Sequence, residues 1–236
     1  MGILGLIPAR GGSKGIPRKN VYPLNGVPLV NYTIEAALGS GRLDRTVLST
    51  DDEEIAEVGR RAGAEVPFLR PAELAQDAST LEEVLDHLLA RLEADEGYVP
   101  DAVMILQPTL PLRTAAHVVQ AVDLLESSGA NTVVAVSEPT EHPAEMVFFE
   151  AGKMRFVLQD TGFRTGVQRQ GYDEVYFLNG AIFLTRTASY REQGTRFAAP
   201  VVPLVMDPLD SIDIDAMHDL IIAELLLKRR AGGARG

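Results

Sequence analysis

The sequence predicts an α/β fold built on a doubly wound, mostly parallel sheet. Short apolar segments of strand length alternate with longer segments whose apolar residues recur at helical spacing. The run at residues 102–106 is continuously apolar, as is typical of a strand covered on both faces. Right-handed crossovers would join the parallel strands, and such sheets bind their ligands beyond the carboxyl ends of the strands.

The individual elements follow from apolar runs and from capping residues. Asp51 and Asp52 open one helix, and Ser79 with Glu82 has the spacing of a capping box at the start of another. The predicted strands are residues 3–7, 46–50, 64–68, 102–106, 132–136, 175–184 and 201–205. The predicted helices are residues 29–38, 51–62, 81–92, 114–127 and 216–228.

Residues 138–175 interrupt this alternation. Two apolar stretches, 146–149 and 154–158, flank a glycine-containing turn and predict a hairpin, so we interpret the segment as an arm or a dimerisation element. No internal repeat or low-complexity linker divides the chain, and the simplest organisation is one domain over residues 1–236. The tail 231–236 is expected to be disordered.

Composition narrows the class of partner. The net charge of -11 and the pI of about 4.8 argue against non-specific binding to nucleic acid or to a membrane surface. The chain has no cysteine, which excludes disulfides and thiolate zinc sites. No signal peptide and no apolar stretch of membrane-spanning length is apparent, so we expect a cytoplasmic protein.

The loop after the first predicted strand is basic, in contrast to the chain as a whole. The stretch IPARGGSKGIPRKN, residues 7–20, carries three glycines and the cations Arg10, Lys14, Arg18 and Lys19. Exposed backbone N–H groups next to cations form a site for an anion such as phosphate. Its spacing fits neither G-x-x-x-x-G-K-[ST] nor G-x-G-x-x-G, which argues against an ATPase or a dinucleotide oxidoreductase. The alternative is a solvated basic turn.

The same stretch closely resembles the signature of the acylneuraminate cytidylyltransferase family, the CMP-sialic acid synthetases and their relatives. Further motifs resemble that family in its own order: LRPAELAQD, LQPTLPLR, FLNGAIF and SIDID, at 69–77, 106–113, 177–183 and 211–215. The resemblance implies a nucleotide-diphospho-sugar transferase-like fold and a Mg²⁺-dependent reaction. In that reaction CMP passes from CTP to the hydroxyl of a nonulosonic (sialic-type) acid, and pyrophosphate leaves.

The resemblance also assigns the triphosphate site. Lys19 is the expected stabiliser of charge that develops at the α-phosphate, with Arg10 as the second catalytic candidate. A fixed cation aimed at developing charge is worth about 3–4 kcal/mol to a transition state. The residues implied to line the triphosphate are Arg10, Ser13, Lys14, Lys19 and Asn20.

Two carboxylates near the C-terminus are candidate metal ligands. Asp213 and Asp215 flank Ile214, and in an extended strand residues two apart share a face. Paired carboxylates suit Mg²⁺ that also contacts phosphate oxygens, and both positions match the metal-binding aspartates of the family. The alternative is a pair of surface acids that precede the last helix. For Asp51 and Asp52 we favour helix capping over metal binding.

Four residues match positions near the cytidine. By resemblance Arg70 and Gln107 lie at the base, and Ser79 or Thr80 reaches the base or the ribose. The Gln107 amide can donate and accept, which the edge of a pyrimidine requires. The alternatives left open are an exposed Arg70 and a Ser79 that only caps a helix.

The sugar acid carries a carboxylate, so its pocket should contain a cation. The resemblance points to Arg169 for that carboxylate and to Asn179 for the sugar hydroxyls. Glu145, Phe177 and Leu110 depart from the family pattern. These departures leave open whether the sugar is N-acetylneuraminate or a legionaminic, pseudaminic or deaminated acid.

The resemblance further implies a homodimer in which the excursion 138–175 reaches the sugar site of the neighbour. Two other functions are kept as alternatives. One is a different sugar nucleotidyltransferase, such as a CMP-3-deoxy-manno-octulosonate synthetase, and the other is a nucleotide-binding scaffold without turnover.

Overall fold

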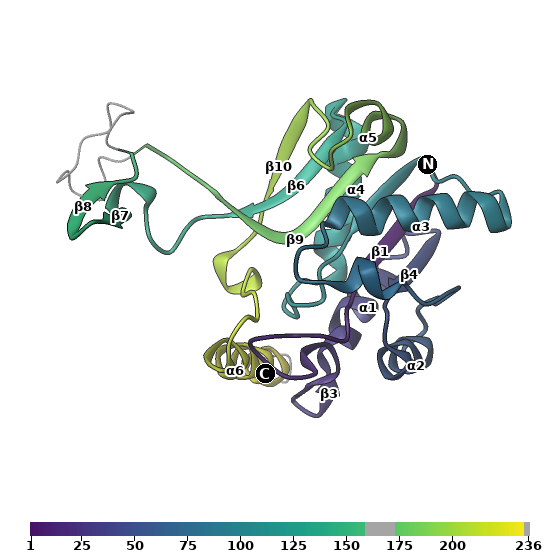
Figure 1. Ribbon diagram of the computed structural model, residues 1–236, viewed down its shortest axis with the longest axis horizontal. Helices are drawn as coiled ribbons and strands as arrows, with labels where there is room; N and C mark the ends of the chain where they lie inside the picture. The colour runs from purple at the N-terminus through teal and green to yellow at the C-terminus, as the bar shows by residue number, and fades with distance from the viewer. Residues whose placement is uncertain (159–172, 234–236) are drawn as a thin grey trace.

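A six-stranded sheet organises the molecule (Figure 1). The computed structural model describes residues 1–158 and 173–233. The strand order is β10-β6-β9-β5-β1-β4, and only β9 runs antiparallel to its neighbours β5 and β6. The strands are β1 Ile3–Pro8, β4 Arg45–Ser49, β5 Ala102–Ile105, β6 Thr132–Ser137, β9 Phe177–Arg186 and β10 Val201–Val205. The predicted α/β fold with a mostly parallel sheet is confirmed.

Helices cover both faces of the sheet, because alternate side chains of each strand point to opposite sides. Along β1, Ile3 and Ile7 pack on one side, and Leu4 and Leu6 pack on the other. The first side is covered by α1 Leu29–Gly39, α2 Glu53–Arg61 and α4 Ala115–Ser128. The second is covered by α3 Leu81–Glu96 and α5 Thr187–Gln193.

A third apolar cluster fastens the last helix, α6 Met217–Gly233, to the start of the chain. Leu220 and Ala223 of α6 pack with Ile214 and with Ile16 of the glycine loop. Two short strands, β2 Pro23–Leu24 and β3 Val27–Pro28, complete this region. The helix continues to Gly233, so the expectation of disorder from residue 231 is wrong for residues 231–233.

Two sequence-based assignments fail for local reasons. The predicted strand 64–68 is reduced to one bridge between Glu65 and Val47, because Pro67 has no N–H with which to extend the ladder. Helix α5 was not predicted, since seven residues are too few for helical periodicity to stand out. Neither error moves a strand of the central sheet.

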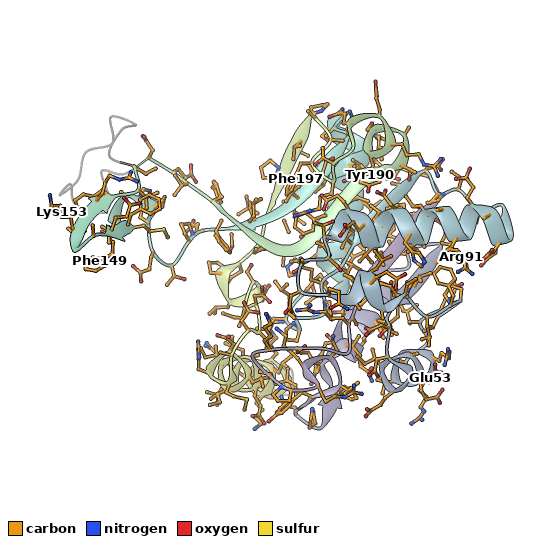
Figure 2. The ribbon with its side chains drawn as sticks, viewed as in Figure 1. Glu53, Arg91, Phe149, Lys153, Tyr190 and Phe197 are labelled. Atoms are coloured by element: carbon orange, nitrogen blue, oxygen red, sulfur yellow. The ribbon has the colours of Figure 1, made fainter. Side chains whose placement is uncertain are left out.

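The excursion forms the predicted hairpin, which projects away from the sheet (Figure 1). Strands β7 Val147–Glu150 and β8 Lys153–Phe156 pair antiparallel around Ala151 and Gly152. Both turn residues have positive φ, 49° and 77°, as a two-residue hairpin turn requires. Phe149 is 79 % exposed and points away from the body of the protein (Figure 2). Among the described helices, none combines the length and apolar character needed to cross a bilayer.

Candidate active site

A pocket of about 390 Å³ opens where β1 and β5 end, at the carboxyl edge of the sheet. Pro8 closes β1 and Gln107 follows β5, and both line it. The glycine loop and the segment that leads into α3 form the remaining walls. The pocket gathers most of the predicted site residues: Arg10, Ser13, Lys14, Lys19, Asn20, Arg70, Ser79, Thr80, Gln107 and Asp215.

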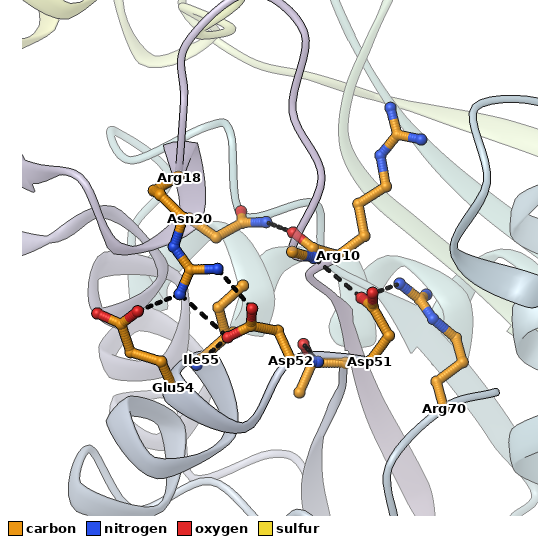
Figure 3. Close-up of polar contacts among 10 residues, drawn as sticks. Arg10, Arg18, Asn20, Asp51, Asp52, Glu54, Ile55 and Arg70 are labelled. Carbon is orange, nitrogen blue, oxygen red and sulfur yellow. Dashed lines mark hydrogen bonds and ion pairs between the residues drawn. The ribbon is translucent and has the colours of Figure 1, made fainter. Parts of the chain in front are cut away.

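The glycine loop is anchored at several points along its length (Figure 3). The Gly11 N–H donates to Asp51 Oδ1 at 2.9 Å, and Asn20 Nδ2 donates to the Arg10 carbonyl oxygen at 2.9 Å. A Cβ on Gly15 would lie 2.3 Å from the backbone oxygen of Asp215, so only glycine fits there without a shift. The loop is therefore held between the N-terminus of α2 and the segment before α6.

Arg18 does not belong to the phosphate-facing cations, which corrects the expectation that the whole loop supplies positive charge. Its guanidinium bonds Asp52 and Glu54 at the start of α2 (Figure 3). These hydrogen bonds, with that to Asp52 the strongest, raise the pKa of Arg18 further. Asp52 also accepts from the Ile55 N–H at 3.0 Å, so the predicted capping role is confirmed.

The cations that remain in the pocket differ in exposure. The Lys19 side chain is only 13 % exposed, and its Nζ donates to the Ile214 carbonyl oxygen at 2.6 Å and lies 3.2 Å from Asp215 Oδ1. The Lys14 side chain is 82 % exposed. Arg10 and Lys14 both pair with the carboxylate of Asp77, at 2.8 and 2.5 Å. The loop thus offers one largely buried cation, Lys19, and two more exposed ones that share a single carboxylate.

Arg70 is buried in the wall of the pocket, beside the Asp51 that anchors the glycine loop, contrary to the alternative of an exposed arginine. The residue is 5 % exposed, and its nearest carboxylate is Asp51, 4.0 Å away (Figure 3). Burial lowers the pKa of Arg70. Its Nε has no hydrogen-bond partner among the described residues. A buried donor of this kind favours a polar ligand.

Gln107 lies beside Gly180 of β9. Gly180 has φ +77°, and a Cβ there would lie 3.0 Å from Gln107 Oε1, so a side chain at position 180 would crowd this amide. The Gln107 carbonyl oxygen accepts from buried Arg113 at 3.1 Å, and Arg113 also donates to the Ala181 carbonyl oxygen at 2.7 Å. Arg113 therefore ties the segment after β5 to β9 from beneath the pocket.

Ser79 and Thr80 both face the pocket, but their hydroxyls already make internal bonds. Ser79 Oγ accepts from the Gln76 N–H at 3.1 Å and donates to the Glu73 carbonyl oxygen at 3.2 Å. Thr80 is the N-cap of α3 and forms a capping box with Glu83. The sequence spacing had placed that box one residue too early, with Ser79.

The predicted sugar-binding residues are not both observed. Arg169 lies outside the described residues. Asn179 is buried, and its side chain donates to Ser211 Oγ at 2.9 Å and accepts from the Ala181 N–H at 3.0 Å. In this structure Asn179 joins β9 to the 211–215 segment and does not line the pocket.

The three departures from the family pattern lie in different surroundings. Leu110 is fully buried in the core. Glu145 and Phe177 are exposed, Glu145 at the base of the arm and Phe177 at the start of β9. The apolar residue at position 110 is thus explained by packing, and nothing in the described contacts explains the other two.

Asp213 and Asp215 lie on either side of Ile214 in a segment that is not a strand of the sheet. Ile214 between them is fully buried, and its N–H donates to the Thr109 carbonyl oxygen at 2.9 Å. Desolvation by the surrounding protein raises the pKa of the Asp213 carboxyl, and the negative charge of Asp215 adds to the rise, whereas a hydrogen bond from Thr109 opposes it. A cation at this pair would relieve that repulsion.

The donor set fits Mg²⁺ shared with a phosphate. No group of three or more histidine, cysteine, aspartate or glutamate side chains suited to a metal occurs within residues 1–158 and 173–233. Mg²⁺ usually keeps waters and substrate phosphates and takes only one or two protein carboxylates. Asp213 and Asp215 supply that number.

Comparison with known proteins matches this geometry. The family model described as Cytidylyltransferase aligns with residues 4–191. The chain belongs to the cytidylyltransferase family. It is 33 % identical, over 92 % of its length, to the N-acylneuraminate cytidylyltransferase of Streptococcus agalactiae serotype V, and spans about half of that relative, 51 %. It is also 33 % identical to the CMP-N,N'-diacetyllegionaminic acid synthase of Legionella pneumophila, with 97 % of each chain covered.

A solved structure shares the fold of this family member. It is a CMP:2-keto-3-deoxy-manno-octonic acid synthetase in complex with CTP, with a TM-score of 0.71 and 13 % identity over 98 % of this chain and 100 % of that one. At that identity the likeness concerns the fold alone. It shows that the two chains share the same arrangement of sheet and helices.

Three residues of this candidate site were missed from the sequence. Asp51 holds the glycine loop, Asp77 pairs with Arg10 and Lys14, and Arg113 supports Gln107. Asp77 and Arg113 each end a motif, LRPAELAQD and LQPTLPLR, so their place beside other site residues was an available signal. Asp51 carried no signal beyond its position before a helix.

Proposed function

We propose that the chain transfers CMP from CTP to the anomeric hydroxyl of a nonulosonic acid and releases pyrophosphate. The observation that carries this proposal is the set of side chains that line one pocket. Cations of the glycine loop, a buried arginine and an amide side chain all line it. That arrangement suits a polyphosphate joined to a base, and the family supports cytidine as the nucleoside.

The residues that line the pocket have distinct tasks in this proposal. Lys19, held rigidly by Ile214 and Asp215, stabilises the negative charge that builds on the α-phosphate during attack. Arg10 and Lys14 bind the phosphates that leave as pyrophosphate. Arg70 and Gln107 bind the cytosine edge, where donors and acceptors are both needed.

Asp213 and Asp215 are the residues that would hold Mg²⁺. The ion supplies charge neutralisation at the phosphate oxygens when bound. The protein's own contribution is to hold Asp215 next to Lys19 and to keep Asp213 close enough to Asp215 for their charges to interact.

The sugar is proposed only as a class. The relatives at 33 % identity carry the names of two different nonulosonic acids, so similarity of this degree supports the class rather than a member of it. We keep Arg169 as the candidate for the sugar carboxylate. Asn179 is bonded to Ser211 and does not line the pocket, so a contact of its own with the sugar hydroxyls is no longer part of the proposal.

We further propose that the active form is a homodimer. The arm exposes Phe148, Phe149 and Met154, and the neighbouring start of β9 exposes Phe177 and Leu178. Apolar surface of this kind on a projecting hairpin favours burial against a second subunit. In such a dimer the arm would reach the sugar side of the partner's pocket.

The test is a substrate screen. The protein is incubated with CTP, Mg²⁺ and, in turn, N-acetylneuraminic, legionaminic, pseudaminic, deaminated nonulosonic and 3-deoxy-manno-octulosonic acids, and CMP-sugar and pyrophosphate are quantified. We expect product with at least one nonulosonic acid. Activity with UTP or ATP but not CTP, or with the eight-carbon acid alone, would contradict the proposal. Binding of CTP without release of pyrophosphate in the presence of any of these sugars would favour a nucleotide-binding scaffold without turnover.

A further inference from the structure

Asp77 faces two cations of the glycine loop. Its Oδ1 lies 2.8 Å from Arg10 Nη2, and its Oδ2 lies 2.5 Å from Lys14 Nζ, so one carboxylate pairs with both. Asp77 itself lines the pocket. The carboxylate therefore occupies the cations that a polyphosphate would need.

The contacts of Asp77 differ from those of the other acids near the loop. Asp51 accepts a backbone N–H of the loop, and Asp52 caps α2. Within the described parts of the chain, the Asp77 carboxylate contacts only the side chains of Arg10 and Lys14. The Asp77 side chain caps no helix and closes no turn in the described structure. Its position next to Arg10 and Lys14 therefore suggests a role in ligand binding.

We propose that Asp77 is an internal substitute for phosphate, which is displaced from Arg10 and Lys14 when a polyphosphate binds and returns to them when pyrophosphate leaves. The proposal rests on the proposed function, because it takes these cations as the site of the leaving group. Asp77 would act as a positioning residue that weakens the retention of product.

Exposure and charge make this exchange possible. The Asp77 side chain is 49 % exposed and that of Lys14 is 82 % exposed, and ion pairs at such positions contribute little net free energy. Hydrogen bonds from Lys14 and then Arg10 hold the pKa of Asp77 below its usual value, so the carboxylate is ionised at neutral pH. A polyphosphate carries several negative charges and competes for the same two cations, while the Asp77 carboxylate repels it.

Lys19 lies outside this exchange. Its Nζ is bound by Ile214 and Asp215, not by Asp77. The loop therefore separates a fixed cation from a pair whose counter-anion can be replaced. While a polyphosphate is bound, its oxygens pair with Arg10 and Lys14. When the product departs, the Asp77 carboxylate pairs with them again, so the two cations are not left unpaired.

The test measures the binding of inorganic pyrophosphate by isothermal titration calorimetry, in the presence of Mg²⁺ and without nucleotide. For Asp77→Asn we expect a dissociation constant at least fivefold lower than that of the wild type, because the competing charge is gone. Asp77→Glu, which retains the charge, should stay within twofold of the wild type. Glu73→Gln removes one charge from the same segment at a residue without an ion pair to Arg10 or Lys14, and should also stay within twofold.

A coupling measurement separates this role from a structural one. Lys14→Met removes one of the two cations at an exposed position, so the gain from Asp77→Asn should be smaller in that background than in the wild type. Unchanged or weaker pyrophosphate binding by Asp77→Asn, with an unchanged melting temperature, would overturn the proposal for Asp77 alone. A wild type that binds no pyrophosphate would contradict both proposals. Tighter binding by Asp77→Asn in a protein that forms no CMP-sugar would contradict the transfer reaction only.

Discussion

At the scale of single residues, the two lysines of the glycine loop are placed in opposite environments. Lys19 is nearly buried and held by a carbonyl oxygen, whereas Lys14 extends into solvent. An ammonium that is already desolvated and fixed stabilises a developing negative charge most strongly, because neither it nor surrounding water has to reorient during the reaction. This difference argues that Lys19 acts in catalysis and that Lys14 acts in binding.

Replacement of Lys19 by alanine is expected to lower turnover at least a hundredfold, about 3 kcal/mol of transition-state stabilisation, in a protein that stays folded. Steady-state kinetics with CTP and the accepted sugar, together with circular dichroism, provide the measurement. Lys228→Ala is the control, because among the described residues Lys228 pairs with Glu224 alone, one turn away on α6. Near-normal turnover of Lys19→Ala would remove this residue from the mechanism.

Two glycines of the loop allow a matched comparison. At Gly15 a Cβ would lie 2.3 Å from a backbone oxygen, whereas at Gly12 nothing lies within 4 Å. We expect Gly15→Ala to weaken pyrophosphate binding at least tenfold by pushing the loop away from Asp215, and Gly12→Ala to change it less than threefold. Titration calorimetry of both variants checks this, and equal effects would show that the close approach at Gly15 is unimportant.

At the scale of elements, the start of α2 works as an anchor for the phosphate loop. Asp51 bonds the loop backbone, while Asp52 both caps the helix and binds Arg18, whose φ of 56° lies in the left-handed region. A non-glycine residue in that conformation needs compensating contacts, and the ion pairs to α2 supply them. The anchor leaves Arg18 unavailable to a ligand.

This anchor predicts a pH-dependent stability. The hydrogen bond from Arg18 lowers the pKa of Asp52 in the folded protein below the value in the unfolded chain. The ionised Asp52 therefore contributes its full stabilisation above about pH 4, and this contribution is lost as the pH falls through the pKa of Asp52 in the folded protein. Asp52→Asn keeps a capping side chain but removes the charge, and its free energy of unfolding should fall less steeply between about pH 4 and 2 than that of the wild type. Urea denaturation across that range provides the test. Parallel curves for the two proteins would contradict it.

At the scale of the whole molecule, the arm is the part least explained by the chain's own packing. It leaves the sheet between β6 and β9 and carries its apolar side chains into solvent (Figure 2). The rest of the molecule buries its large apolar residues on the two faces of the sheet and under α6. A surface of this composition supports the proposed homodimer.

Phe149→Glu is expected to convert a dimer into a monomer, because it places a charge in the middle of the apolar surface of the arm. Light scattering at micromolar concentration gives the mass. Lys153→Glu, at the turn end of the same hairpin, should leave the dimer intact. A monomeric wild type under these conditions would exclude the shared pocket and leave Arg169 to act within its own chain.

Much of the fold followed from local patterns, and the failures have local causes as well. Strand 201–205 has the predicted bounds, and helix α1 ends within one residue of them, because continuous apolar runs and helical spacing are properties of short segments. The segment 64–68 has the composition of a strand, but Pro67 stops its ladder after one bridge. The antiparallel direction of β9 could not be read from its sequence, since direction depends on the route of the preceding arm.

The sequence by itself determined the α/β architecture, the basic loop after the first strand and most of the residues that line the pocket, because apolar period, glycine content and motif spacing are local properties. Only the tertiary structure decided which cations are available. Arg18 is held by α2, Lys19 is fixed by the segment before α6, and Arg10 with Lys14 faces Asp77. The physical reason is that an ion pair depends on distance in space and not on distance along the chain. Arg18 and its partner Asp52 are 34 residues apart in the sequence, and Lys19 and its partner Asp215 are 196 residues apart.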